Sequence, residues 1–246
     1  MLRTIRADLH IHSCLSPCGD EEMRPRAVVR KALAMGLDMI AICDHNSAEN
    51  VYSFMGAGLE RGLTVLPGME VTSKEEIHLI ALFSRQEDCM ALQDLIYRHL
   101  PGENAEEVFG RQTMVNDKDE MIGVNRKMLI GATLLPIEQI VSAVGSLGGV
   151  VIASHIDRQA FSLLGQLGFI PEGLSLDGLE ISTRTSKEEA QKRFHAYRRY
   201  SFVRFSDAHY LEDIGRNITH FLLEETTSEE VKKALHHQEG RRVVEQ

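Results

Sequence analysis

Short apolar segments alternate with amphipathic segments along most of this 246-residue chain. Seven of the apolar segments are rich in Ile, Val and Leu and show little polar alternation, which is typical of strands covered on both faces. They span residues 4–10, 38–44, 63–71, 77–84, 149–155, 178–182 and 202–207. Repeated strand–helix units favour a parallel sheet, and over this length we expect the sheet to close into a barrel.

The segments between these strands carry the start and stop signals of helices. Pro25 suits the first turn of a helix that ends at Gly36, and Pro136 begins another that ends at Gly148. Ser186 and Thr227 each precede a glutamate by three positions, which is the spacing of a capping box. The last two predicted helices therefore begin at these residues.

One stretch, residues 101–135, is polar and irregular, with a hairpin-like pattern at 112–124. It has too few apolar residues to form a core of its own. The sequence therefore predicts a single domain over residues 1–246, with this stretch as an insertion folded over the barrel. A loop over a barrel mouth can shape the pocket, so we expect the insertion to select among substrates.

Composition excludes some classes of protein. The hydrophobic content of 43% is enough for a large core, and no run of eighteen apolar residues could span a membrane. The first residues lack the apolar region of a secretory signal. The four cysteines form no C-x-x-C pair, so reduced thiols and a cytoplasmic location are expected.

The formal net charge of −9 bears on partners. Extended nucleic-acid binding normally needs a basic face, so the charge makes it an unlikely role for this chain. A small phosphorylated substrate stays possible, because bound metal ions would neutralise acidic groups that a formal count leaves charged. The oligomeric state is left open.

Residues with metal-binding side chains stand at the ends of the predicted strands. The C-terminal ends of parallel barrel strands meet at one rim, so residues far apart in sequence are expected to converge there. Imidazole and carboxylate groups are suitable ligands for divalent Zn, Mn or Fe. The set comprises His10, His12, Asp44, His45, Glu70, His78, His155, Asp207 and His209.

A single histidine at a strand end is usually structural or exposed. Six of the eleven histidines stand at such ends with acidic companions, however, and burying them together without metal would be costly. We assign no site role to the remaining histidines on helical or terminal segments, and leave His220, near the last strand, undecided. The former are His99, His195, His236 and His237.

The ordered motifs resemble those of the PHP (polymerase and histidinol phosphatase) superfamily. They are residues 8–13 (DLHIHS), 36–46 (GLDMIAICDHN), 67–70 (PGME) with His78, and 206–209 (SDAH). The resemblance covers nearly the whole chain except the insertion. It implies a distorted (β/α)7 TIM-like barrel, two or three divalent metal ions (Zn, Mn or Fe), and hydrolysis of phosphoric esters.

The resemblance also implies a set of metal ligands. The loop after the first strand, residues 14–25, is longer here than in the family pattern, so more than one residue can be aligned with the family's acidic ligand. We choose Asp20, and Glu21 or Cys18 could take its place. Cys14 and Cys18, near His12, also suggest a thiolate ligand or an oxidation sensor, although small loop residues are an equally good account. The implied ligands are His10, His12, Asp20, His45, Glu70, His78, His155, Asp207 and His209.

The expected reaction is attack on phosphorus by a hydroxide bridged between two metals. Glu70 would bridge the metals, Asp207 would help position the nucleophile, and Asp44 would orient a ligand. Arg158 and Arg184 are expected to grip the phosphate, with Arg216 a weaker candidate.

The expected substrate is a small phosphomonoester or phosphodiester. The alternatives are histidinol phosphate, a nucleic-acid phosphoester, a non-phosphate amide or ester, or a non-catalytic metal-binding PHP module. The small acidic chain favours the first, and the apparently complete ligand set speaks against the last.

Overall fold

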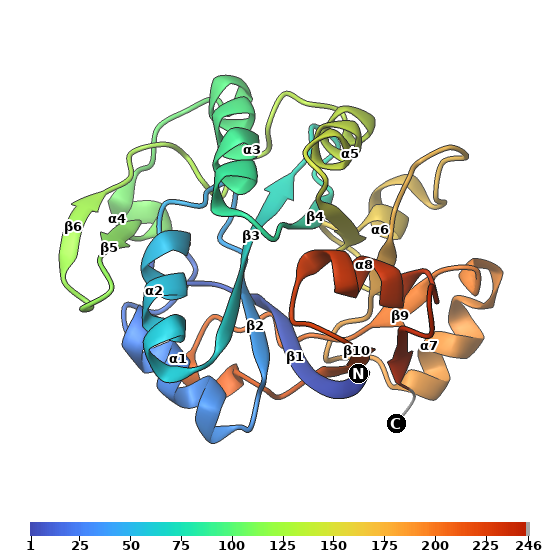
Figure 1. The fold of residues 1–246 in the computed structure, drawn as a ribbon. Helices are drawn as coiled ribbons and strands as arrows, with labels where there is room; N and C mark the ends of the chain where they lie inside the picture. Colours follow the sequence, from blue (N-terminus) through green and yellow to red (C-terminus); the bar gives the residue numbers. More distant parts are fainter. Residues whose placement is uncertain (245–246) are drawn as a thin grey trace.

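The computed structural model describes residues 1–244, whose strands form a nine-stranded sheet curled into a nearly closed barrel (Figure 1). The strand order is β11-β10-β1-β2-β3-β4-β7-β8-β9. The α/β barrel predicted from the sequence is confirmed. The strands are β1 Arg3–Ile11, β2 Met39–Ile42, β3 Thr64–Thr72, β4 His78–Leu82, β7 Val150–Ala153, β8 Gly178–Glu180, β9 Ser201–Val203, β10 Thr219–Leu223 and β11 Arg242–Val244.

The predicted helix signals act as expected. Pro25 begins α1, Gly36 follows it with a φ of +70°, and the Ser186 and Thr227 side chains each accept a hydrogen bond from the backbone N–H three residues on. None of the helices within residues 1–244 is long and apolar enough to cross a membrane. The helices are α1 Pro25–Ala34, α2 Val51–Arg61, α3 Gln86–His99, α5 Ile137–Ser146, α6 Leu163–Leu167, α7 Lys187–Arg193 and α8 Ser228–Leu235, with short 3-10 helices at His195–Tyr197 and Leu211–Asp213.

The expectation of an all-parallel sheet is wrong for β4, which runs antiparallel to both β3 and β7. The reason is the short link, since Thr72 at the end of β3 pairs with His78 at the start of β4. A parallel crossover needs a dozen residues or more, so this link can only form a hairpin. The start of β4 therefore lies at the same rim as the end of β3.

Strands β10 and β11 were not predicted. β10 runs antiparallel to β1, and β11 pairs with the other edge of β10. Between β9 and β10 the sheet has no strand pairing, and the seam is bridged by the Thr219 hydroxyl, which accepts from Arg204 N–H and donates to Arg204 O. Toward the rim, the segment after β9 pairs with the end of β1, where His12 N–H donates to Ala208 O and Ala208 N–H donates to His10 O, so the barrel closes there through backbone hydrogen bonds.

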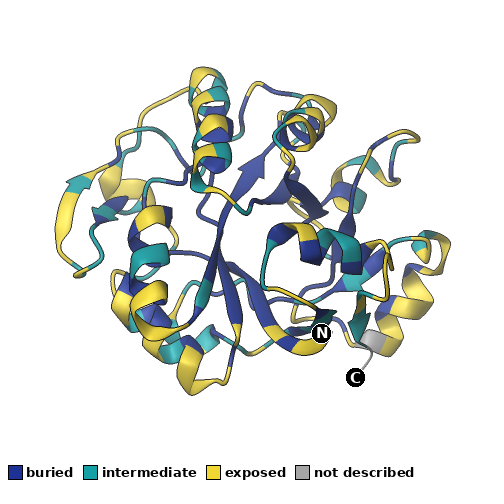
Figure 2. Ribbon diagram, in the orientation of Figure 1, coloured by how far each residue is buried: buried dark blue, intermediate teal, exposed yellow. Residues whose placement is uncertain are grey.

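The core has two layers, one inside the barrel and one between the sheet and the outer helices (Figure 2). In β1, Ile5, Ala7 and Leu9 belong to the inner layer, whereas Ile11 belongs to the outer layer. The alternation breaks because the pairing of β1 with β2 shifts register between Asp8 and Ile11. Such a bulge re-aims side chains at the end of a strand, and here it brings His10 to the inner side together with Leu9.

The insertion contains the short helix α4 (Glu106–Phe109) and the hairpin of β5 (Thr113–Val115) and β6 (Met121–Val124), which confirms the predicted hairpin. This hairpin lies beside α2 (Figure 1), held there by Asn50 and Ser53, which hydrogen-bond to the backbone of Thr113 and Val115. The following segment reaches the rim, where Asn46 donates to Leu129 O and Gly131 O.

Candidate metal centre

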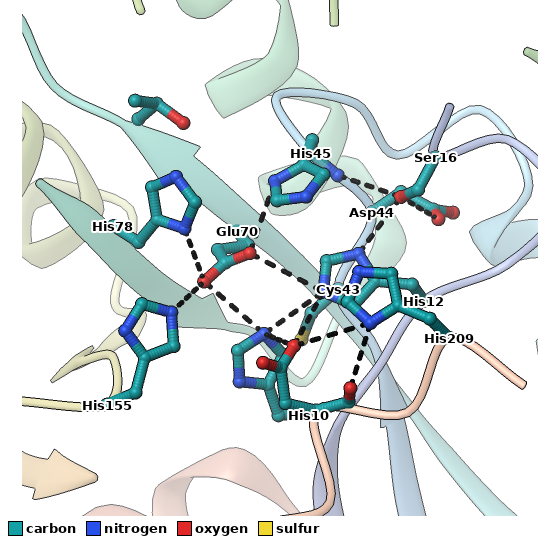
Figure 3. Close-up of polar contacts among 12 residues, drawn as sticks. His10, His12, Ser16, Cys43, Asp44, His45, Glu70, His78, His155 and His209 are labelled. Carbon is teal, nitrogen blue, oxygen red and sulfur yellow. Dashed lines mark hydrogen bonds and ion pairs between the residues drawn. The ribbon is translucent and has the colours of Figure 1, made fainter. Parts of the chain in front are cut away.

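Glu70, in β3, lies at the middle of a cluster of histidines (Figure 3). Its two carboxylate oxygens are 3.0–3.4 Å from ring nitrogens of five of them. His78 and His155 lie on one side of Glu70, and His12 and His45 lie on the other (Figure 3). The five are His10, His12, His45, His78 and His155.

Asp207 forms a second, smaller centre beside Glu70. Its Oδ1 is 3.4 Å from His10 Nε2, 3.3 Å from His12 Nε2 and 3.7 Å from His209 Nδ1. The His209 ring stacks on that of His12, with 4.2 Å between centroids. The two carboxylates are therefore linked through His10 and His12, which touch both.

The local backbone explains why these side chains converge. The bulge in β1 turns His10 inward, the β3–β4 hairpin brings His78 to the rim, and β2 ends just before His45. His155 and Asp207 adopt positive φ angles of 30° and 51°. L-residues rarely adopt this region, and strained positions of this kind concentrate at functional sites.

Glu180, at the end of β8, orients His10 and was missed by the sequence analysis. Its carboxylate lies 3.1 Å from His10 Nδ1 and accepts the backbone N–H of His155 at 2.9 Å. A carboxylate on one ring nitrogen leaves the other, Nε2, directed at Glu70 and Asp207. The signal was an acidic residue within a predicted buried strand, where an unpaired charge would be costly.

Asp44 acts on His12 through a serine. The Ser16 hydroxyl lies 3.0 Å from His12 Nδ1 and donates to Asp44 at 2.7 Å, while Asp44 also accepts the Ser13 N–H and hydroxyl. A further buried carboxylate, Asp8, accepts the N–H groups of Ser206 and Gly215 at the two ends of the loop that carries Asp207. Burial raises the pKa of Asp8 to about 6.

The two central carboxylates are held as anions. Burial opposes their charge, but nearby imidazoles outweigh it, chiefly those of His78 and His10 for Glu70 and those of His10 and His12 for Asp207. The pKa of each carboxyl therefore lies well below its ordinary value. Both carboxylates are in the form that a cation binds.

The imidazoles divide into two kinds. Burial and the neighbouring His209 lower the pKa of His12 to about 4, and burial and His12 lower that of His45 well below its ordinary value. For His10, burial is opposed by Glu180, Glu70 and Asp207, which raise its pKa well above the ordinary value. His12 and His45 are thus neutral, as metal-binding imidazoles must be.

Apart from Ser16, the loop of residues 14–25 makes no side-chain hydrogen bond or ion pair with Glu70, Asp207 or the clustered histidines. Asp20 is partly exposed, its N–H donates to His209 O, and its carboxylate accepts from Glu22 N–H. Glu21 binds Thr113 and Arg24, Cys18 is exposed, and Cys14 is buried with its Sγ 3.6 Å from Thr113 O. Burial, with Asp44 and Glu21 nearby, raises the pKa of Cys14 to about 12, so it is kept as a thiol.

The three arginines differ in position. Arg158 donates to Asp207 at 2.5 Å, at the edge of the cluster. Arg184 is exposed, on a loop that Asp157 holds by accepting from Ser182 and Thr185. Arg216 is paired with Asp213 outside the cluster. Arg158 alone of the three contacts a residue of the site.

The donor set fits divalent cations. His45 Nδ1, Glu70 Oε1, His78 Nδ1 and His155 Nδ1 are buried and make no hydrogen bond among the described residues, although the first three take part in the imidazole–carboxylate contacts given above. Buried polar atoms without a hydrogen bond are rare and call for an explanation such as a bound ion. Three overlapping groups have ligand atoms within 4.8 Å of one another, and they contain His10, His12, His45, Glu70, His78 and His209.

The sequence profile of the PHP domain matches residues 8–170, which is more than half of the chain. The chain therefore belongs to the PHP domain family, as the motifs predicted.

Solved structures with a similar fold include two of endonuclease Q. The lesion-specific endonuclease from Pyrococcus furiosus has a TM-score of 0.75 at 17% identity, and endonuclease Q in complex with a 27-mer duplex bearing an abasic lesion has 0.73 at 18%. Each covers 98% of this chain, which spans only 58% of their length. At these identities the likeness shows the fold.

Two further relatives differ in length. A protein from Bifidobacterium adolescentis described as a metal-dependent phosphoesterase has a TM-score of 0.60 at 19% identity, covering 94% of this chain and 96% of that one. A 5'-3' exoribonuclease from Haemophilus influenzae is 32% identical over 82 residues, which are 32% of this chain and 29% of that protein.

Proposed function

We propose that this chain is a metal-dependent phosphoesterase that hydrolyses a phosphoester bond at the Glu70 cluster. The observation that carries the proposal is the contact of one buried carboxylate with five imidazoles. A carboxylate shared in this way can bridge two or three divalent cations. Membership of the PHP family and the fold of the Bifidobacterium protein support the assignment.

Glu70 would bridge the cations, and Zn, Mn and Fe all suit the surrounding ligands. When bound, such cations acidify water and neutralise the charge of a phosphoryl group. Seven further residues would hold them: His10, His12, His45, His78, His155, Asp207 and His209. Asp20 stays a predicted additional ligand.

The protein's other groups would orient the site and the substrate. Glu180 fixes His10, and Ser16 fixes His12, so that each ring keeps one nitrogen toward the carboxylates. Arg158 has a buried Nε without a partner among the described residues and one terminal nitrogen on Asp207. Its guanidinium is therefore available to a phosphoryl oxygen next to Asp207, and we propose that it helps to position the substrate. Exposed Arg184 would contact the substrate farther from the metal centre than Arg158 does.

The experiment is a hydrolysis screen of protein loaded separately with Mn, Zn or Fe. Substrates are p-nitrophenyl phosphate, bis(p-nitrophenyl) phosphate, histidinol phosphate, nucleotides, sugar phosphates and short oligonucleotides. We expect turnover of a phosphoester, its loss in Glu70→Gln, and full activity in the exposed control Glu60→Gln. A folded, metal-loaded protein that hydrolyses none of them would favour the non-catalytic module instead.

A further inference from the structure

A groove of about 880 Å³ follows the seam between β9 and β10 on the outside of the barrel. Residues of α7 and the 3-10 helix after it form one wall, and residues of β10 and β11 form the other. We call it the seam groove. Its described lining contains none of the eight clustered residues that we propose as metal ligands.

The seam groove concentrates positive charge in a chain whose formal net charge is −9. Residues 190–206 include five cations and no Asp or Glu. Two of these cations, Arg198 and Arg204, line the groove together with Arg216 from the opposite wall, and the one carboxylate in its described lining is Glu188. The five are Lys192, Arg193, Arg198, Arg199 and Arg204.

Two hydrogen-bond donors in the groove lack acceptors. Arg204 Nε and Asn217 Nδ2 are buried, with no hydrogen-bond partner among the described residues. A buried donor without an acceptor is destabilising, so both atoms suit a ligand that brings oxygen atoms. Arg216 is already paired with Asp213, and exposed Arg198 is bound to His195 Nε2. Arg204 is therefore the strongest candidate for an anion contact.

Aromatic rings accompany these cations. Tyr200 and Phe202 line the groove and are partly exposed, and the Arg199 guanidinium lies over the Tyr200 ring, 4.9 Å from its centroid. A basic groove with aromatic side chains is the usual design of sites for single-stranded nucleic acid, in which phosphates meet the cations and bases stack on the rings.

Two chain segments carry residues of both the groove and the metal centre. Arg204 is three residues before Asp207, and Ile181 in the lining directly follows Glu180, which holds His10. We propose that the seam groove binds a single-stranded nucleic acid whose scissile phosphoester lies at the metal centre. This inference rests on the proposed phosphoesterase function and names its substrate class.

The test measures binding of a fluorescent 12-nucleotide phosphorothioate oligothymidylate, which resists hydrolysis, to the metal-loaded protein. The variant is Arg198→Glu with Arg204→Glu. The control is Arg30→Glu with Arg61→Glu, two exposed arginines on α1 and α2 that give the same change in net charge. Thermal melting verifies folding, and Arg204→Gln is the second variant, should the double charge reversal fail to fold.

We expect the Kd of the groove variant to rise about tenfold or more, and the slope of log K against log salt to fall by about 1.4, since each phosphate contact on a single strand contributes about 0.7. The control should bind like the parent protein. Arg204→Gln should show a smaller rise in Kd. Equal weakening in variant and control, or equally tight binding of a mononucleotide, would overturn the inference.

A second measurement separates this inference from the proposed function. The groove variant should hydrolyse bis(p-nitrophenyl) phosphate and a dinucleotide like the parent. For the parent, kcat/KM should be higher with an unmodified 12-nucleotide strand than with the dinucleotide, and the variant should lose this difference. If small phosphoesters are hydrolysed while the variant and the parent bind the oligonucleotide with the same Kd, the groove assignment is wrong and the proposed phosphoesterase function is retained. If the substitutions weaken oligonucleotide binding but the protein hydrolyses no phosphoester, the groove is retained as a binding site and the proposed phosphoesterase function is rejected.

Discussion

Glu180 determines how His10 is presented to the rest of the site. Both its oxygens lie within 3.2 Å of His10 Nδ1, and one also accepts the N–H of His155, a residue with positive φ. One side chain thus supports two of the proposed ligands. Neutralising it removes a charge-assisted contact without removing any proposed ligand.

We expect Glu180→Gln to weaken metal affinity or activity by about 10–100-fold, which is typical for a partner that orients a metal-binding histidine. Metal titration followed by kcat/KM at saturating metal measures both effects. Glu172→Gln, on an exposed loop, is the control. Unchanged metal affinity and activity in Glu180→Gln would contradict this role.

At the same scale, the sequence predicted the clustered side chains better than their supports. The proposed ligands could be recognised because histidines and carboxylates follow apolar segments at several strand ends. An orienting role was predicted for Asp44, but Ser16, through which it acts on His12, was missed, and so was Glu180. Both depend on a side-chain direction or on a contact between residues far apart. The same limit applies to Arg158, whose contact with Asp207 no spacing indicates.

At the scale of the elements, β3 carries Glu70 under close packing from β2. A Cβ on Gly68 would lie 2.7 Å from Cys43 Sγ and 2.9 Å from Ile42 O, closer than side chains tolerate. Glycine at this position therefore lets β3 lie against β2 two residues before the central carboxylate.

We expect Gly68→Ala to destabilise the protein by about 1–3 kcal/mol, the usual cost of overpacking a core. Gly145→Ala is a matched control, because a Cβ there meets nothing within 4 Å and alanine favours the helix α5. Chemical unfolding of both variants measures the difference. A Gly68→Ala protein as stable as the parent would show that β2 and β3 can move apart.

Hydrophobic periodicity predicted the direction of most strands but not of all. Six of the seven predicted strands run in the expected common direction, because short apolar segments separated by helices form parallel units. β4 does not, since its direction depends on the length of a turn. β10 and β11 were not predicted, because their pairing at the barrel edge is not encoded in a local pattern.

At the scale of the whole molecule, the net charge differs in sign from the local charge at the seam groove. A net charge of −9 argued against extended nucleic-acid contact, yet residues 190–206 are free of acidic side chains and follow the seam of the barrel. The seam lies where β9 is unpaired with β10 and β11, and no sequence pattern revealed it. The family and the barrel could be predicted, whereas the surface around the seam required the structure.

The central claim is that eight side chains between His10 and His209 share divalent cations. Anomalous diffraction from crystals grown with Mn²⁺ measures this directly, because only the metal contributes strongly at its absorption edge. We predict two or three peaks within bonding distance of the nitrogen and oxygen atoms of this cluster, at least one of them shared by Glu70. Well-ordered crystals with the eight side chains resolved and no anomalous peak among them would contradict the account.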